Sequence, residues 1–443
     1  NVKTLRAFYV ERKNFRTRIL GLHPRRTWLA SPATLPTKGF PVRKTILKLA
    51  AALAALAVVV PASAQVMVRK SAGSKIGVDL SGLQVSGAAA QTVRRTLELD
   101  LNRSGWMEVA PAGQGAFAVS GAISDAGGQV AFKCQVTDAA GQTYINAAYA
   151  QPANQAVRLA HQVANDVVVK TTGKPTFFLG ELVLVGTKGG TKELYLADSS
   201  CQAIQQLTND RTVLKPRWSP DNRFIAYTSF LKRWPDVYTI ERATGARVQA
   251  SFFPGLNSGG AISPNGRSMA LILSKDGVSP DLYVQDMATK RLTRLTNTPQ
   301  ATEGSPCWSP DGSRIVYVSN ASGSPQLYLI SGTGGAPQRL TTRGAQNAAP
   351  DWGKNGLIAY QTLSGGKFQI AVMDPATMQE RVITPFDAAY EDPSWAPDGR
   401  HLAAARSINY NYSVYLLDSM AALGDKPVSL TSTGEWTSPA WSR

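Results

Sequence analysis

The sequence predicts a multidomain chain in which an N-terminal α+β domain is followed by an all-β six-bladed β-propeller. Two observations predict the propeller: a tryptophan motif that recurs every 43 to 46 residues, and two ends of the repeat region that complete each other. A different pattern of helices and hairpins before the repeats predicts the α+β domain. We expect four segments, namely a non-structural extension, a signal peptide, the α+β domain and the propeller, at 1–41, 42–64, 65–176 and 177–443.

The repeated unit begins with a motif related to Trp-Ser-Pro-Asp-Gly. Its first positions are Trp218, Ile262, Trp308, Trp352, Trp395 and Trp441. Ser, Pro, Asp and Gly in this order favour a type I turn between two strands. An apolar run follows each complete turn, as at 315–318, and another follows later, as at 327–329. In most units a Leu-Thr or Ile-Thr pair then ends a fourth strand. Four strands per repeat of this length are typical of a propeller blade.

The two ends of the repeat region predict the number of blades. Trp441-Ser442-Arg443 supplies a first strand with no blade behind it, whereas 181–185, 193–196 and 206–208 supply three strands that lack a first one. Joined together they make one composite blade, which closes the ring and leaves no free sheet edge. Five continuous blades and this composite blade make six.

Residues 65–176 follow another pattern. Val93, Leu97 and Leu101 share one helical face, and Ser104-Gly105 ends that helix. A strand is expected at 106–109, and three more at 116–124, 129–137 and 142–150 are separated by Asp- and Gly-containing turns. A second helix is expected from about 153 to 170, before Gly173. Two helices and a small sheet indicate an α+β domain.

The charge is concentrated at the front of the chain. The formal net charge is +17, but residues 1–64 contain twelve Lys or Arg and one acidic residue, so the remainder is nearly balanced and nucleic-acid binding is not expected. Basic residues at 43–48, an apolar run at 49–60 and Ala62-Ser63-Ala64 are typical of a signal peptide cleaved after Ala64. The run is too short to span a bilayer. An exported chain would contain an odd number of cysteines, namely Cys134, Cys201 and Cys307. We interpret all three as buried thiols.

The expected mature chain offers little catalytic chemistry. His161 is expected on the solvated side of the second helix, and His401 flanks the Asp398-Gly399 turn. No serine-hydrolase, nucleotide-binding or zinc motif occurs. The Asp or Asn of each turn is interpreted as a turn former because these residues recur only once per blade. The sequence therefore predicts no enzyme and no cofactor.

The loops that connect each Leu-Thr to the next tryptophan motif should converge on one face of the ring. Tyr and Trp lie there among acidic and amide side chains, with Phe386 nearby, which is the composition of a protein-binding surface. The alternative is ordinary solvation of loops. The predicted partner-binding residues are Lys215, Leu256, Asn257, Ser258, Thr302, Glu303, Gly304, Gln346, Asn347, Tyr390, Glu391, Asp392, Glu435 and Trp436.

The order of exported α+β domain and six-bladed propeller resembles the TolB family, the periplasmic components of Tol-Pal systems. The resemblance also rests on the runs 250–253, 281–286 and 334–341 and on the ending Ser438-Pro439-Ala440-Trp441-Ser442. It covers the whole expected mature chain. Leu256 and Ile262 depart from the family, which has His and Trp at these positions, and the fourth repeat lacks its Ser-Pro.

The resemblance implies a non-enzymatic periplasmic scaffold that supports outer-membrane integrity and constriction during cell division. It implies that the propeller face binds the peptidoglycan-associated lipoprotein Pal, and that a mature N-terminal segment reaches TolA in the inner membrane. That segment is Val66, Met67, Val68, Arg69 and Lys70. Contact with the membrane would be through partners only. Some propellers of the family hold calcium in the channel, but no local motif here indicates it.

Two other functions remain open at this point. An exported propeller enzyme acting on peptide or polysaccharide would need His or paired carboxylates converging on the channel, and the connecting loops contain no His. A secreted propeller that binds a different ligand is equally compatible with the fold, since propellers are reused widely.

Overall fold

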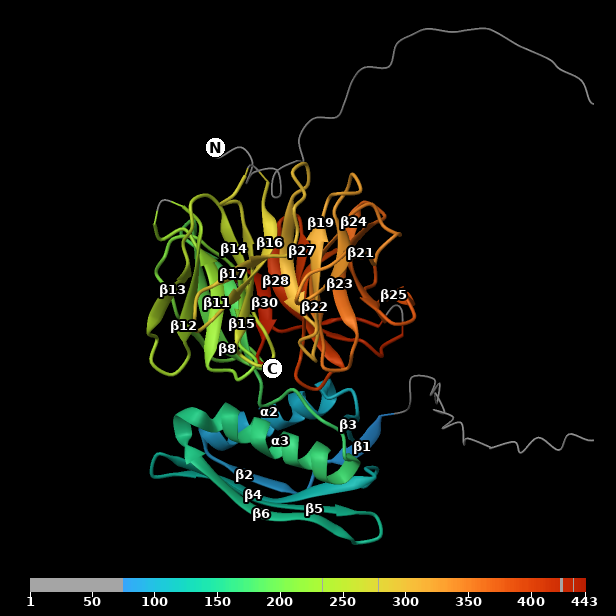
Figure 1. Ribbon diagram of the computed structural model, residues 1–443. Coiled ribbons are helices and arrows are strands. Elements are labelled where there is room, and N and C mark those ends of the chain that lie inside the picture. The colour runs from blue at the N-terminus through green and yellow to red at the C-terminus, as the bar shows by residue number, and fades with distance from the viewer. Residues whose placement is uncertain (1–74, 233, 278, 423–424, 433) are drawn as a thin grey trace, which may run out of the picture. The chain divides into compact units, whose positions relative to one another are not determined.

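The computed structural model describes residues 75–443 except 233, 278, 423–424 and 433 (Figure 1). The predicted signal peptide, its predicted cleavage site and the segment at 66–70 lie outside the described residues. The described residues belong to one compact unit. No helix in the described part is long and apolar enough to cross a bilayer.

The N-terminal part is a six-stranded sheet with two helices, as the α+β prediction requires. Its spatial order is β3-β1-β4-β5-β6, with β2 also paired to β4. The strand β1 pairs parallel with β3 and β4, and β2 pairs parallel with β4. The strands β4, β5 and β6 pair antiparallel with one another in that order. The elements are β1 (Ile76–Asp79), β2 (Leu83–Ser86), α2 (Ala88–Arg103), β3 (Met107–Ala110), β4 (Phe117–Ala126), β5 (Gln129–Asp138), β6 (Thr143–Pro152), the short 3₁₀ helix η1 (Ala153–Gln155) and α3 (Ala156–Thr172).

The two helices lie side by side on one face of this sheet (Figure 1). The predicted apolar stripe of α2 is confirmed, because Val93, Leu97 and Leu101 are all buried. The helix α3 ends where expected, since Gly173 adopts a left-handed conformation and its N–H bonds the carbonyl of Val169 at 2.9 Å. The strands β1 and β2 are not in the sequence prediction.

The remainder is a six-bladed β-propeller, which confirms the predicted fold. Five blades are continuous four-stranded sheets in sequence order. In chain order they comprise β10 (Val213–Trp218), β11 (Phe224–Ser229), β12 (Asp236–Glu241) and β13 (Arg247–Ser251); β14 (Asn257–Ile262), β15 (Ser268–Leu273), β16 (Asp281–Asp286) and β17 (Leu292–Arg294); β18 (Glu303–Trp308), β19 (Arg314–Ser319), β20 (Gln326–Ser331) and β21 (Gln338–Arg339); β22 (Asn347–Trp352), β23 (Ile358–Ser364), β24 (Lys367–Met373) and β25 (Glu380–Val382); β26 (Ala389–Trp395), β27 (His401–Ile408), β28 (Asn411–Asp418) and β29 (Val428–Ser429).

The sixth blade is the predicted composite. Its strands are β30 (Glu435–Trp441), β7 (Glu181–Lys188), β8 (Thr191–Asp198) and β9 (Ile204–Gln206), in that spatial order. The inner strand β30 pairs antiparallel with β7. The main-chain N–H of Glu181 also donates to the Ser442 hydroxyl at 2.9 Å. We call this sheet the closing blade. It joins two segments that are far apart in the sequence and so closes the ring.

The repeat motif has a structural purpose, which the blades that begin with β10 and β18 show. The Ser309 hydroxyl donates to Asp311 at 2.5 Å and accepts the N–H of Arg314 at 2.9 Å, which fixes the turn between the first two strands. The indole of Trp308 donates to the carbonyl of Ala261 in the preceding blade at 2.9 Å. Trp218 does the same to Ala440 of the closing blade at 3.0 Å. The motif therefore builds turns and joins neighbouring blades.

The Leu-Thr pairs are also structural. In five blades the threonine hydroxyl accepts an N–H from the third strand of its own blade, at 2.9 or 3.0 Å. These threonines are Thr208, Thr296, Thr341, Thr384 and Thr431. Each hydroxyl thus holds the end of the outer strand against the sheet and sets where the following loop begins. In the remaining blade β13 ends at Ser251, whose hydroxyl donates to Asn257 at 2.8 Å instead.

The predicted position of His161 in solvent is wrong, and His401, which does flank the Asp398-Gly399 turn as expected, is also buried. His161 of α3 is 3% exposed, and its Nδ1 lies 2.6 Å from Asp100 of α2. Its Nε2 lies 3.5 Å from Asp198 at the end of β8, so an ion-pair network joins the α+β domain to the closing blade. His401 is 1% exposed and its Nδ1 lies 2.5 Å from Asp398. The polar side of α3 is covered by the propeller, which the periodicity of the helix alone does not reveal.

Candidate functional site

The two ends of the propeller ring differ in the connections that they carry. One end, which we call the turn face, carries the turns between the first two strands of each blade. The opposite end, which we call the loop face, carries the hairpins between the second and third strands and the loops that enter each inner strand. The described residues of the loop face are 189–190, 207–212, 230–232, 234–235, 252–256, 274–277, 279–280, 295–302, 320–325, 340–346, 365–366, 383–388, 409–410, 430–432 and 434.

Exposed aromatic side chains gather on the loop face. Among the described residues four Trp, Phe or Tyr side chains are largely exposed: Trp234, Phe252, Phe386 and Tyr410, at 54%, 67%, 44% and 70%. All four lie on its loops and hairpins. A soluble surface does not usually present several large aromatic side chains on one side, so this face has the composition of an interaction surface.

The four aromatics form two local groups. Trp234 and Phe252 belong to adjacent connections of one blade, because the N–H of Asn257 bonds the carbonyl of Pro235 at 3.2 Å. Phe386 and Tyr410 belong to the blade that begins with β26. There the guanidinium of Arg406, near the end of β27 that leads into the hairpin, binds Asp387 of the connecting loop at 2.7 Å. Sequence reasoning missed Trp234, Phe252 and Tyr410. Phe252 directly precedes the connecting loop that was expected from residue 254, and the hairpins with Trp234 and Tyr410 necessarily emerge on the same face as the connecting loops.

Of the fourteen predicted partner-binding residues, ten are at least partly exposed and four are buried. Lys215, Gln346 and Glu435 are exposed, and seven others are half-buried: Leu256, Ser258, Thr302, Gly304, Glu391, Asp392 and Trp436. The other four are buried, and their prediction as surface contacts is wrong: Asn257, Glu303, Asn347 and Tyr390.

The buried four hold the loops together from inside. Glu303 accepts the N–H of Leu282 at 2.9 Å and the Thr296 hydroxyl at 2.5 Å. The amide of Asn347 donates to Gln326 at 2.8 Å. Asn257 accepts the N–H of Phe253 at 2.8 Å. These side chains satisfy backbone and amide groups that the loops would otherwise bury unpaired.

Tyr390 is a core residue rather than a rim residue. It is 0% exposed and packs in an apolar cluster with Trp395 and Leu402. Its hydroxyl donates to Asp387 at 3.0 Å. Burial and the Asp387 carboxylate together raise the pKa of Tyr390. Only its hydroxyl approaches the loop, so the ring cannot serve as an anchor for a partner.

Each inner strand has an unusual backbone conformation at one position, and these six positions form a ring around the channel. Each inner strand has an irregularity in its pairing register. At that irregularity one residue has a positive φ, and in five blades proline follows it. The six residues are Lys215, Gly260, Ser305, Ala349, Asp392 and Ser438. A left-handed conformation is unfavourable for residues other than glycine, so its repetition around the ring is a feature that the fold maintains.

Two members of this ring form an ion pair across the closing blade. The ammonium of Lys215 binds the carboxylate of Asp392, which comes from a blade two positions away. Asp392 also accepts the Ser438 hydroxyl at 2.7 Å. Burial alone would raise the pKa of Asp392, but the Lys215 ammonium and the Ser438 hydroxyl outweigh it and lower the pKa.

A second set of channel residues precedes the tryptophan of each repeat. Arg217 of one blade reaches across the ring to the carbonyl of Pro350 at 2.9 Å and to Asp351 at 3.3 Å. Arg443, which follows β30, donates to the same Asp351 oxygen at 2.7 Å. The other Asp351 oxygen accepts the N–H of Trp395 at 2.7 Å. This position could have been found from the sequence, since the residue before each motif tryptophan lies on an inner strand.

The charges of these channel residues do not fit a calcium site. Calcium takes six to eight oxygen ligands, mainly from carboxylates and carbonyls. Asp351 and Asp392 are already paired with Arg217, Arg443 and Lys215. In the described part of the chain no group of three or more His, Cys, Asp or Glu side chains is placed to hold a metal ion. The chain's own cations thus neutralise the carboxylates that a divalent cation would need.

Comparison with known proteins gives consistent results. Residues 168–443 match the family described as the TolB beta propeller domain. A protein of Chlorobium chlorochromatii named "Protein TolB homolog" is 33% identical over 210 residues, 46% of either chain. The "Tol-Pal system protein TolB" of Francisella tularensis subsp. tularensis is 31% identical over 303 residues, 64% of this chain and 68% of that one. The chain thus spans about half of the first relative and about two thirds of the second.

The crystal structure of TolB from Acinetobacter baumannii has the same fold. It superposes with a TM-score of 0.72 at 24% identity, and the match covers 83% of this chain and 96% of that one. The fold and the site define a six-bladed propeller that closes on a composite blade, follows an α+β domain and presents aromatic side chains on its loop face. The chain belongs to the TolB propeller family.

Proposed function

We propose that this chain is a non-enzymatic periplasmic scaffold of a Tol-Pal system and that its loop face binds a Pal-type lipoprotein. The observation that carries the proposal is the gathering of Trp234, Phe252, Phe386 and Tyr410 on that face. Aromatic anchors contribute a large share of the energy of protein interfaces because each one buries a large apolar area. The relatives named after the Tol-Pal system support this choice of partner.

The positions of the histidines favour binding over catalysis. His161 and His401, the two histidines in the described residues, are both buried in ion pairs with aspartates. The ring of His401 packs at a tilt against the ring of Phe177, which precedes β7, with 4.8 Å between their centroids. Neither histidine lies on the loop face, so neither could act there as a general base on a peptide or polysaccharide.

The same proposal assigns a role to the expected mature N-terminus. The segment Val66, Met67, Val68, Arg69 and Lys70 would bind a TolA-type inner-membrane protein by strand addition, for which alternating apolar and basic residues are suited. Binding through this segment and through the loop face would link the two membranes and so support outer-membrane integrity and constriction during division.

Removal of aromatic anchors should weaken binding without unfolding the propeller. We expect Trp234→Ser with Phe252→Ser to weaken the affinity for the purified periplasmic domain of a Pal-type lipoprotein by at least about tenfold, since anchor residues often contribute about 2 kcal/mol each. Phe386→Ser with Tyr410→Ser tests the second group in the same way. Isothermal titration calorimetry gives the dissociation constants.

A matched control uses exposed apolar side chains on outer strands. Val248 of β13 and Val428 of β29 are 64% and 38% exposed. Val248→Ser with Val428→Ser should leave the affinity unchanged, and all variants should keep the thermal midpoint of the wild type. An equal loss of affinity in this control, or no loss in either aromatic pair, would contradict the assignment of the loop face.

A further inference from the structure

The channel has a pocket at the end opposite to the loop face. Its walls include Pro220, Pro264 and Pro310, which belong to the turns between first and second strands, so the pocket lies at the turn face. The cavity has a volume of about 120 Å³. Trp308 and Trp352 supply much of its apolar wall. It is therefore a separate feature from the proposed partner-binding surface.

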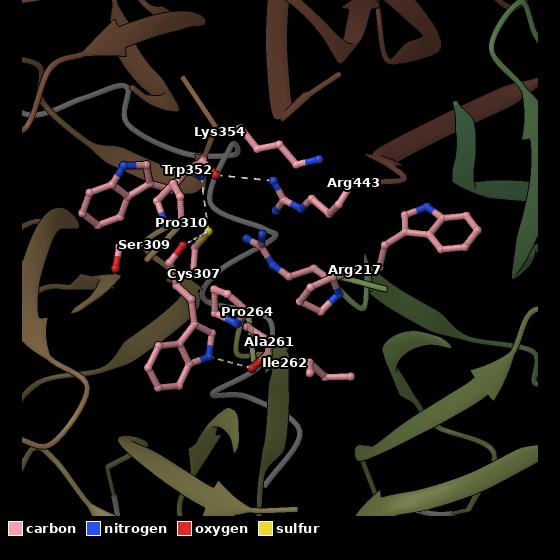
Figure 2. Close-up of a pocket in the computed structure, with 13 residues that line it drawn as sticks. Arg217, Ala261, Ile262, Pro264, Cys307, Ser309, Pro310, Trp352, Lys354 and Arg443 are labelled. Atoms are coloured by element: carbon pink, nitrogen blue, oxygen red, sulfur yellow. Dashed lines mark hydrogen bonds between the residues drawn. The ribbon is translucent and has the colours of Figure 1, made fainter. Parts of the chain in front are cut away.

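Positive charge dominates this pocket. Arg217 and Arg443 both project towards its middle, and Lys354 lies at its edge (Figure 2). The two guanidinium groups are neighbours because both donate to one oxygen of Asp351, at 3.3 and 2.7 Å. Among these side chains, Asp351 supplies one negative charge for three positive ones. Lys354 is exposed and has no ion-pair partner among the described residues.

The two arginines have donors to spare. Each guanidinium carries five N–H groups in a planar fork that suits carboxylate and phosphate oxygens. Contacts with Asp351 and with the carbonyls of Pro350 and Trp352 use only some of them. The arginine side chains are 20% and 24% exposed, so they are partly withdrawn from water yet remain accessible.

The fold fixes these cations from several blades. Arg217 and Asp351 come from two different inner strands, β10 and β22, and Arg443 lies directly after a third, β30. The main chain of Arg443 is held by Asn222, whose side-chain oxygen accepts its N–H at 2.6 Å. Lys354 lies in the turn after β22. Two adjacent guanidinium groups that share one carboxylate repel each other, and a second anion would relieve that repulsion.

We propose that the turn-face pocket of the channel binds a small anion carrying a carboxylate or phosphate group, through the guanidinium groups of Arg217 and Arg443 and the ammonium of Lys354. The apolar walls lower the local dielectric and strengthen such an interaction. The anion would connect the blades that meet at the pocket. This inference does not depend on the proposed partner, because it concerns the opposite end of the channel.

Titration of the purified chain with inorganic phosphate, and separately with citrate, tests the proposal. Each titration is run against chloride at equal ionic strength and followed by calorimetry and by thermal unfolding. We expect saturable binding of at least one anion in the millimolar range or below, together with a rise in the unfolding midpoint. Saturable binding of phosphate alone, of citrate alone or of both would support the site. The result would also define which oxygen groups the site accepts.

Variants assign the binding to the pocket. Lys354→Ala removes an exposed charge and should weaken anion binding about fivefold while leaving the fold intact. Arg443→Lys keeps the charge but loses the planar fork, and should weaken binding about tenfold. The matched control is Lys188→Ala, an exposed lysine at the end of β7 beside the loop face. Absence of saturable binding in the wild type, or an equal loss in Lys188→Ala and Lys354→Ala, would overturn the proposal.

Discussion

Asp351→Ala should lower the free energy of unfolding by about 3 kcal/mol or more, the largest single effect that the channel geometry predicts. The carboxylate is 2% exposed and binds Arg217, Arg443 and the N–H of Trp395. Its removal leaves two adjacent guanidinium groups without their shared anion and one buried N–H without an acceptor. Burial alone would raise the pKa of Asp351, but the two arginines outweigh it and lower the pKa.

Urea unfolding of the wild type, Asp351→Ala and Asp351→Asn measures this effect. The Asn side chain keeps the shape and one oxygen that can accept the N–H of Trp395, so we expect a smaller loss than with Ala. A free energy of unfolding for Asp351→Ala within about 1 kcal/mol of the wild-type value would contradict a stabilising role of the channel network.

The junction between the α+β domain and the closing blade should lose stability as the pH rises. Burial alone would lower the pKa of His161, but Asp100 and Asp198 outweigh it and raise the pKa from 6.5 to about 9. A histidine with a raised folded-state pKa contributes stability that is fully present below the unfolded pKa and is lost as pH rises through the folded pKa. We therefore expect the wild type to lose on the order of 3 kcal/mol between about pH 6.5 and above pH 9.

A neutral pair of similar shape is the control for this effect. His161→Gln with Asp100→Asn keeps hydrogen-bonding groups at the junction but removes both titrating groups. Its free energy of unfolding should be nearly constant over the same pH range, apart from changes common to the rest of the chain. If the wild type and the double variant change in parallel, His161 does not carry the pH dependence.

The architecture could be predicted because its determinants are local. Serine, proline and aspartate at 219–221 and 309–311 define turns wherever the chain places them, and the strand after each turn is a short apolar run. The composite blade followed from counting strands at both ends. The strands β1 and β2 were missed because each has only four residues and is stabilised by parallel partners distant in sequence.

The site was predicted less well because burial depends on what covers a residue. Asn257, Glu303 and Asn347 have the composition of solvated loop residues, yet each accepts or donates bonds that organise its own loop. His161 lies on the polar side of α3, but the propeller covers that side. The channel cluster joins Arg217 to Asp351 across the ring, and no local pattern specifies which charges meet there.

The most direct test of the central claim is affinity capture from an envelope extract of the host, with the tagged chain as bait at low and at moderate salt. Binding through the loop face predicts recovery of a Pal-type lipoprotein with the wild type and with the Val248 and Val428 control. It predicts strongly reduced recovery with the Trp234 and Phe252 variant. Recovery of no such lipoprotein at either salt concentration, or equal recovery with every bait, would contradict it.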